Sequence, residues 1–194
     1  MLLVLKILFF FLGAMQQPDG GASCQSLLIS YEVRVQSKNR NKSTAELYNG
    51  SSKLLAIRPD TIEVRLTSLL RNEKVWILRK GSGYTGKILK DSSGSKRSYG
   101  ITMEEWKGSF QPWVQAKLEE GGAEEKIAGY NCRRAVLKGA DNQVLVVYYT
   151  DRLHHKAYKI AEPMFSSVPG VVLKYEFRSR ESVITYTASK VVVR

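Results

Sequence analysis

Apolar and polar side chains alternate at every second position along several segments of this chain. The alternation is clearest in residues 27–36, and it recurs in residues 61–67 and 171–178. A period of two is typical of a strand that buries one face and exposes the other. Residues 75–78 and 144–149 are apolar on both faces, which predicts strands that are covered on both sides. The pattern therefore predicts a mostly β protein with an antiparallel sheet.

Turn signals separate the predicted strands. Asn49 and Gly50 lie between apolar segments at residues 45–48 and 53–57, and an Asn-Gly pair favours a hairpin because both residues tolerate positive φ. Residues 80–100 are rich in Gly, Ser and Lys, which predicts a long hairpin or a mobile loop. The sequence contains no internal repeat, so we expect a single domain.

Helical spacing is confined to residues 102–120. Thr102 and Glu105 form the signature of a capping box, which predicts the start of a helix. Pro112 must end or bend that helix because it lacks a backbone N–H, and a second short helix containing Trp113 is expected to follow. One face of the first helix carries three large apolar side chains, Met103, Trp106 and Phe110.

The chain opens with an apolar run, residues 1–14, which has the length of a signal peptide and is too short to span a membrane as a helix. We assign residues 1–23 to a signal peptide and residues 24–194 to one domain. Cleavage is expected after one of three small residues, Ala14, Ala22 or Ser23. The predicted location is therefore outside the cytoplasm, either periplasmic or associated with the outer membrane.

The chain has two cysteines, Cys24 and Cys132. Residues 21–24 resemble a bacterial lipoprotein signal, but Gly21 stands where that signal has a large aliphatic residue, so ordinary cleavage is preferred. An exported protein with two free cysteines would then join Cys24 to Cys132, and closing so long a loop would stabilise the fold by about 3 to 5 kcal/mol. In the alternative, Cys24 carries a lipid that associates the protein with a membrane, and Cys132 is a small buried hydrophobic residue.

The formal net charge of the chain is +12, and its basic residues are spread singly over predicted strand faces and loops. A charge of this size attracts polyanions, but export and the lack of a recognition-helix pattern argue against a nucleic acid partner. We interpret the basic residues as a solvated surface. The alternative is a binding site for an anionic lipid or another polyanion.

No motif in the sequence predicts a cofactor, a metal site or catalysis. Residues 81–88 contain glycines in a phosphate-loop pattern, but Ile88 stands where a P-loop has Ser or Thr, and no helix pattern follows. His154 and His155 are adjacent, so on a strand they would point to opposite faces and could not share a metal ion. We therefore expect a protein that is not an enzyme and uses no cofactor.

Three segments together resemble the GLPGLI family of exported proteins. They are residues 126–135 with a Gly-Tyr-x-Cys block, residues 148–151, and residues 167–173, where Ser167 and Val168 replace the first two residues of the naming motif. That family is similar to the lipoprotein-carrier (LolA-like) superfamily. The resemblance implies an α+β, mostly β fold, in which a curved antiparallel sheet forms an open half-barrel and short helices pack on its concave face. It also implies an apolar cavity between them.

The leading hypothesis is a non-enzymatic binding protein of the cell envelope that holds a lipid or another apolar ligand in this cavity. Six large side chains are predicted to line it, namely Trp76, Met103, Trp106, Phe110, Trp113 and Tyr175. Side chains of this kind at helical spacing are as often plain core residues. The alternative is a structural or interaction protein of the envelope, with a solid core and a basic surface that binds another envelope protein.

Overall fold

The computed structural model describes most of the chain after its N-terminal segment. The described ranges are residues 22–37, 49–69, 71–92, 94–140, 143–178 and 182–194. Most of the predicted signal peptide and the predicted strand at residues 45–48 lie outside them.

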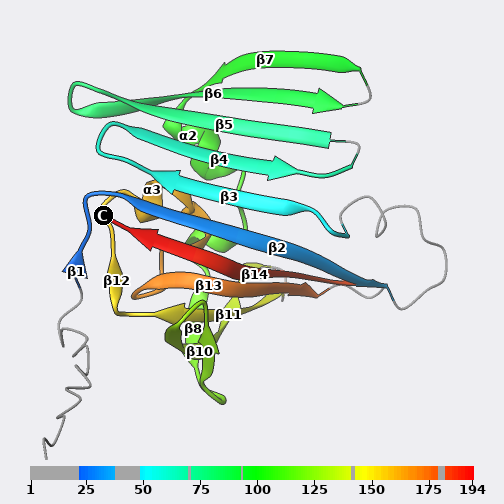
Figure 1. The fold of residues 1–194 in the computed structure, drawn as a ribbon, viewed down its shortest axis with the longest axis vertical. Helices are drawn as coiled ribbons and strands as arrows, with labels where there is room; N and C mark the ends of the chain where they lie inside the picture. Colours follow the sequence, from blue (N-terminus) through cyan, green and yellow to red (C-terminus); the bar gives the residue numbers. More distant parts are fainter. Residues whose placement is uncertain (1–21, 38–48, 70, 93, 141–142, 179–181) are drawn as a thin grey trace, which may run out of the picture.

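One open antiparallel sheet of 12 strands dominates the described chain (Figure 1). Its strands from the first half of the chain are β2 (Leu27–Ser37), β3 (Ser52–Ile57), β4 (Thr61–Thr67), β5 (Arg71–Lys80), β6 (Gly83–Ser92) and β7 (Ser95–Ile101). Those from the second half are β8 (Lys117–Glu120), β9 (Glu125–Ile127), β10 (Tyr130–Lys138), β11 (Val144–Thr150), β13 (Val171–Arg178) and β14 (Ser182–Val193). The predicted mostly β, antiparallel fold is confirmed.

The strand order in the sheet is β7-β6-β5-β4-β3-β2-β14-β13-β11-β10-β8, and β9 pairs with β10 beside this path. β2 and β14 join the two halves, since they pair antiparallel from Leu27 opposite Val193 to Ser37 opposite Ser182. Two short strands, β1 (Ala22–Ser23) and β12 (Leu153–His154), form a separate parallel pair. The first and last strands of the large sheet are therefore neighbours at its centre.

The strand pattern of the sequence places the core on one face of the sheet. Leu27, Ile29, Tyr31 and Val33 alternate along β2 and are all almost fully buried. In β11, the consecutive residues 145–147 are buried, so the prediction of two covered faces is confirmed there.

The same prediction of two covered faces is wrong for β5. Its inner face is covered, because Val75 and Ile77 are buried. On its outer face Trp76 is only partly buried and Leu78 is 48% exposed. The Lys74 ammonium lies 4.3 Å from the centre of the Trp76 ring, so a long polar side chain rather than a second layer covers that tryptophan.

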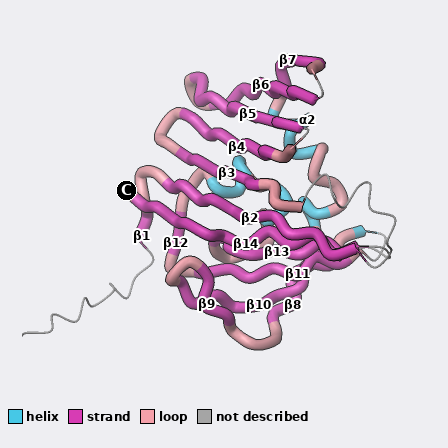
Figure 2. Tube along the Cα trace, turned by 45° about the vertical axis from the view of Figure 1, so that its right-hand side comes forward, coloured by secondary structure: helices cyan, strands magenta, loops and turns pink. Residues whose placement is uncertain are grey.

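Within the described ranges, four short helical segments accompany the sheet, namely α2 (Met103–Gly108), η1 (Trp113–Gln115), α3 (Tyr158–Ala161) and η3 (Pro163–Phe165). The predicted capping box is confirmed, since Thr102 Oγ1 accepts a hydrogen bond from the Glu105 N–H and Glu105 accepts one from the Thr102 N–H. The Trp106 indole N–H donates to the Ile160 carbonyl oxygen at 2.9 Å, which ties α2 to α3. Figure 2 shows these segments gathered beside the strands, and α3 contacts β3 and β4.

The glycine-rich stretch at residues 80–100 forms two hairpins. Gly81 has φ 59° in the turn between β5 and β6, and Gly94 has φ 85° in the turn between β6 and β7. Strand β6 follows the first turn directly, so the glycines do not open a helix that could cradle a phosphate. Of the two predicted alternatives, the hairpin is confirmed over the mobile loop, and the stretch forms two hairpins rather than one.

Two of the segments behind the family resemblance meet at Gly170. A Cβ atom on this residue would lie 2.2 Å from the Thr150 carbonyl oxygen and 3.1 Å from the Asp151 nitrogen. Backbone atoms cannot yield as a flexible side chain can, so only glycine fits here. The third segment also has a structural role, because Ala128 (φ 48°) and Gly129 (φ 90°) form the tight turn between β9 and β10.

Candidate functional site

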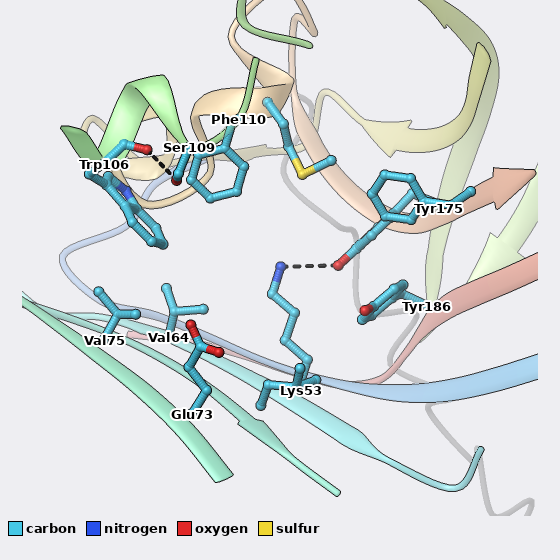
Figure 3. A pocket seen from close by; sticks show the side chains of 12 residues that line it. Lys53, Val64, Glu73, Val75, Trp106, Ser109, Phe110, Tyr175 and Tyr186 are labelled. Atoms are coloured by element: carbon cyan, nitrogen blue, oxygen red, sulfur yellow. Dashed lines mark hydrogen bonds between the residues drawn. The ribbon is translucent and has the colours of Figure 1, made fainter. Parts of the chain in front are cut away.

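A cavity of about 310 Å³ lies between the sheet and the helical segments (Figure 3). Five strands of the sheet, β3, β4, β5, β13 and β14, contribute side chains from one face. These side chains are Lys53, Val64, Leu66, Glu73, Val75, Tyr175, Phe177 and Tyr186. The helical side contributes Trp106, Ser109, Phe110 and Met164. Most of these side chains are apolar or aromatic, and only a few polar groups are placed among them.

The period of two brings the sheet residues of the cavity together. Val64 and Leu66 are two positions apart on β4, so they share a face, and Val64 pairs with Val75 on β5. On the helical side, Trp106 and Phe110 are one helical turn apart and meet edge to face, with ring centres 4.7 Å apart. The cavity thus combines a strand repeat and a helix repeat that the sequence contains separately.

Lys53 brings a charge into this apolar environment. Its Nζ atom lies 2.5 Å from Glu162 Oε1, and the two side chains are only 11% and 2% exposed. The same Nζ donates a hydrogen bond of 3.0 Å to the Tyr175 hydroxyl (Figure 3). An isolated buried charge would be very costly, so the opposite charge of Glu162 is what permits an ammonium group here.

The contact between Lys53 and Glu162 is an ion pair without hydrogen-bond geometry. Neither carboxylate oxygen of Glu162 has a hydrogen-bond partner among the described residues, although both are buried. Among the described residues, the ammonium group of Lys53 is therefore the group that stabilises this buried carboxylate, through its charge.

Three buried tyrosines surround the pair, namely Tyr31, Tyr158 and Tyr175. Burial above all, together with the nearby negative charge of Glu162, raises the pKa of each phenol well above its ordinary value. The Tyr31 hydroxyl donates to the Val172 carbonyl oxygen at 2.8 Å, and the Val172 N–H donates to the Tyr158 hydroxyl at 3.0 Å. The phenols are neutral, and the ion pair carries the charge of this region.

A second group of charges surrounds Glu73, which also lines the cavity. Arg71 lies 2.8 Å from its carboxylate and Lys90 lies 3.5 Å from it. All three side chains are at least 24% exposed. A hydrogen bond with Tyr99 first, and Glu73 after it, raise the pKa of Lys90. This part of the cavity lining is therefore polar and near solvent, whereas the part at Lys53 is buried.

The structure brings together three of the six residues that the sequence placed in a cavity. Trp106, Phe110 and Tyr175 line it jointly. Met103 instead lines a neighbouring cavity that shares Trp106 with the first.

The remaining two predicted residues lie elsewhere. Trp113 is buried, and its ring contacts Phe177 edge to face with centres 6.1 Å apart, so it belongs to the core. Trp76 lies on the opposite face of β5 from Val75, because neighbouring residues of a strand point in opposite directions. The prediction that Trp76 lines the cavity is therefore corrected.

Sequence reasoning missed Lys53, Glu162 and Val64. Lys53 stands two and four positions before Leu55 and Ile57, which are fully buried, so the strand period placed it on the inner face. Glu162 had no comparable signal, because it lies in a short irregular segment between α3 and η3.

The predicted disulfide between Cys24 and Cys132 is not formed, and both cysteines are free. The Cys24 thiol points to the His154 carbonyl oxygen at 3.4 Å, beside the pair of β1 and β12. The Cys132 thiol is buried on β10 and faces the Tyr130 carbonyl oxygen at 3.5 Å. Because each thiol lies against a different local partner, the structure corrects the disulfide prediction.

No three His, Cys, Asp or Glu side chains in the described part of the chain are arranged to hold a metal ion. Among the same residues, no helix combines the length and the apolar character needed to cross a bilayer.

No family model matches the sequence, and no curated protein matches it. Among solved structures, the chain is similar to one described as "Structure of PNGF-II in C2 space group", with a TM-score of 0.45 and 16% sequence identity. The similarity covers 88% of this chain and 28% of that chain, so the present chain spans less than a third of the longer one. A likeness this weak carries no argument about function.

Proposed function

We propose that this protein is a non-enzymatic binding protein of the cell envelope that holds a lipid or another apolar ligand between the sheet and α2. The observation that carries the proposal is the cavity of about 310 Å³, with apolar walls and few polar groups. Small-molecule sites in proteins have this size and this composition. In this proposal the sheet is an open half-barrel, and the short helices cover its concave face.

The lining of the cavity favours a ligand with an apolar body and one oxygen atom at its inner end. An ammonium group has three hydrogens, and among the described residues Lys53 donates one hydrogen bond, to the Tyr175 hydroxyl, while Glu162 balances its charge. Another hydrogen can donate to a carbonyl or hydroxyl oxygen of a ligand. Because Glu162 already balances the charge of Lys53, a neutral polar end fits better than an anionic one.

The alternative of an envelope protein with a solid core predicts an interior without a cavity of ligand size. The cavity is therefore the observation that favours the binding hypothesis over it. The charge of +12 is compatible with both and separates neither.

The test is extraction of the purified protein and mass spectrometry of the extract, followed by titration with a fluorescent fatty alcohol. Val64→Trp fills the cavity, and we expect it to weaken binding by roughly 10-fold or more, since a well-packed side chain would occupy the ligand volume. Val144→Trp is the matched control, because Val144 is 41% exposed on β11 and does not line the cavity. Equal binding by both variants, or protein that is empty and binds no probe, would refute the proposal.

A further inference from the structure

A second cavity, of about 380 Å³, adjoins the first at Trp106. It is a groove between α2 and the segment formed by α3 and η3. The apolar part of its lining comes from Tyr84, Met103, Ile160 and Pro163, and Trp106 is shared with the first cavity.

Two hydrogen bonds hold the walls of this groove in place. The bond from the Trp106 indole N–H to the Ile160 carbonyl oxygen fixes the distance between its two sides. The Ser166 hydroxyl, which also lines the groove, donates to the Val114 carbonyl oxygen at 2.7 Å. These polar groups are thus already satisfied, and the interior that the groove offers to a ligand is apolar.

Two lysines, Lys107 on α2 and Lys159 on α3, line the same groove from opposite sides. Both side chains are exposed, and neither ammonium group forms an ion pair or a hydrogen bond with any described residue. No acidic residue lines the groove. Glu104 is one helical turn before Lys107 but forms no ion pair with it.

We propose that this groove binds a single-chain amphipathic anion, with its alkyl chain between α2 and α3 and its carboxylate or phosphate head between Lys107 and Lys159. Apolar walls bury the chain, and the two ammonium groups, which have no partner among the described residues, supply the complementary charge. This site differs from the first cavity, where Glu162 neutralises the buried lysine. It does not depend on the function proposed above.

The test is calorimetric titration of the full chain with dodecanoate and with dodecyl phosphate, below their micellar concentrations and at low salt. Dodecanol and dodecyltrimethylammonium serve as the neutral and cationic comparisons. We expect both anions to bind more tightly than either comparison, and the tighter anion identifies the preferred head group. Binding of the anions should weaken as salt is added, because exposed charges are screened.

The decisive variant is Lys107→Gln/Lys159→Gln. We expect it to weaken dodecanoate binding roughly 10-fold, because the carboxylate of the ligand loses its exposed ion pairs with both lysines, and to leave dodecanol binding unchanged. Lys87→Gln/Lys126→Gln is the control with the same change of net charge, at exposed lysines outside both cavities. Val64→Trp should leave dodecanoate binding intact, which separates this groove from the first cavity. The proposal is overturned if the two double-lysine variants lose affinity for dodecanoate equally. It is also overturned if the anions bind no more tightly than dodecanol and dodecyltrimethylammonium, or if binding begins only above the micellar concentration.

Discussion

Lys53 and Glu162 form an ion pair in which both side chains are almost excluded from solvent, with 2.5 Å between Nζ and Oε1. The lysine lies on β3 in the first half of the sheet, and the glutamate lies between two short helices that are more than a hundred residues later in the chain. The pair therefore joins the sheet to the helical segments beside the cavity that Lys53 lines.

Breaking this pair should destabilise the protein strongly. We expect Lys53→Met and Glu162→Gln each to lower the free energy of unfolding by about 3 to 5 kcal/mol, because each leaves a buried group without its partner. The double variant should lose much less than the sum, since it removes both charges together. Urea denaturation of the four proteins measures the coupling.

The pair between Lys138 and Glu119 provides the control for this cycle. Its atoms are 2.7 Å apart, but the side chains are 53% and 55% exposed. Lys138→Met should therefore cost at most about 1 kcal/mol. Additive effects in the Lys53 cycle, or equal costs at the two sites, would contradict the role assigned to burial.

Gly170→Ala should destabilise the fold by about 3 kcal/mol or more. The new methyl group would lie 2.2 Å from the Thr150 carbonyl oxygen, so the backbone must move. Gly108→Ala is the matched substitution at a glycine with nothing within 4 Å of the added atom, at the end of α2. There we expect no loss and a gain of up to about 1 kcal/mol, because alanine favours a helix. Thermal unfolding of both variants tests the pair of expectations.

Cys132 should resist alkylation in the folded protein. Burial raises the pKa of its thiol to about 11, which leaves only about 0.1% thiolate at pH 8, and the side chain is inaccessible as well. Labelling with iodoacetamide and peptide mass spectrometry should find Cys132 modified only after denaturation. Denaturation without a reductant should then reveal two thiols, and a protein with none until reduction would restore the disulfide prediction.

The capping box of α2 should make a small part of the stability dependent on pH. Hydrogen bonds from Thr102 lower the pKa of the Glu105 carboxyl below its ordinary value of 4.5. The unfolded state then binds the proton more readily, so the contribution of Glu105 is present above pH 4.5 and is lost as the pH falls through the folded pKa.

Urea denaturation at several pH values measures this contribution. Glu105→Gln should be less stable than the wild type at pH 7, and this difference in stability should nearly vanish near pH 3. For Glu104→Gln, in the same turn but outside the cap, the difference from the wild type should not shrink as the pH falls. Thr102→Ala should cost about 1 kcal/mol at neutral pH. A difference between Glu105→Gln and wild type that stays constant with pH would contradict the capping role.

Local patterns predicted much of the fold. The period of two in residues 27–36 and 171–178 gave strands whose inner faces are buried, and the Thr102 capping box marked the start of α2. These predictions held because each depends on neighbours within a few residues. The expectation for β5 failed because an apolar run does not say whether a second layer covers the strand, and Trp76 is covered by Lys74 instead.

The sequence by itself determined the strand faces, the turns and the helix start, since backbone geometry fixes where each side chain points relative to its neighbours. Only the tertiary structure decided which faces meet across long separations. It placed Trp106 and Phe110 opposite Val64 and set Lys53 against Glu162. The physical reason is that a buried charge is tolerated only beside an opposite charge. Packing between segments that are distant in the sequence determines which residue supplies that opposite charge.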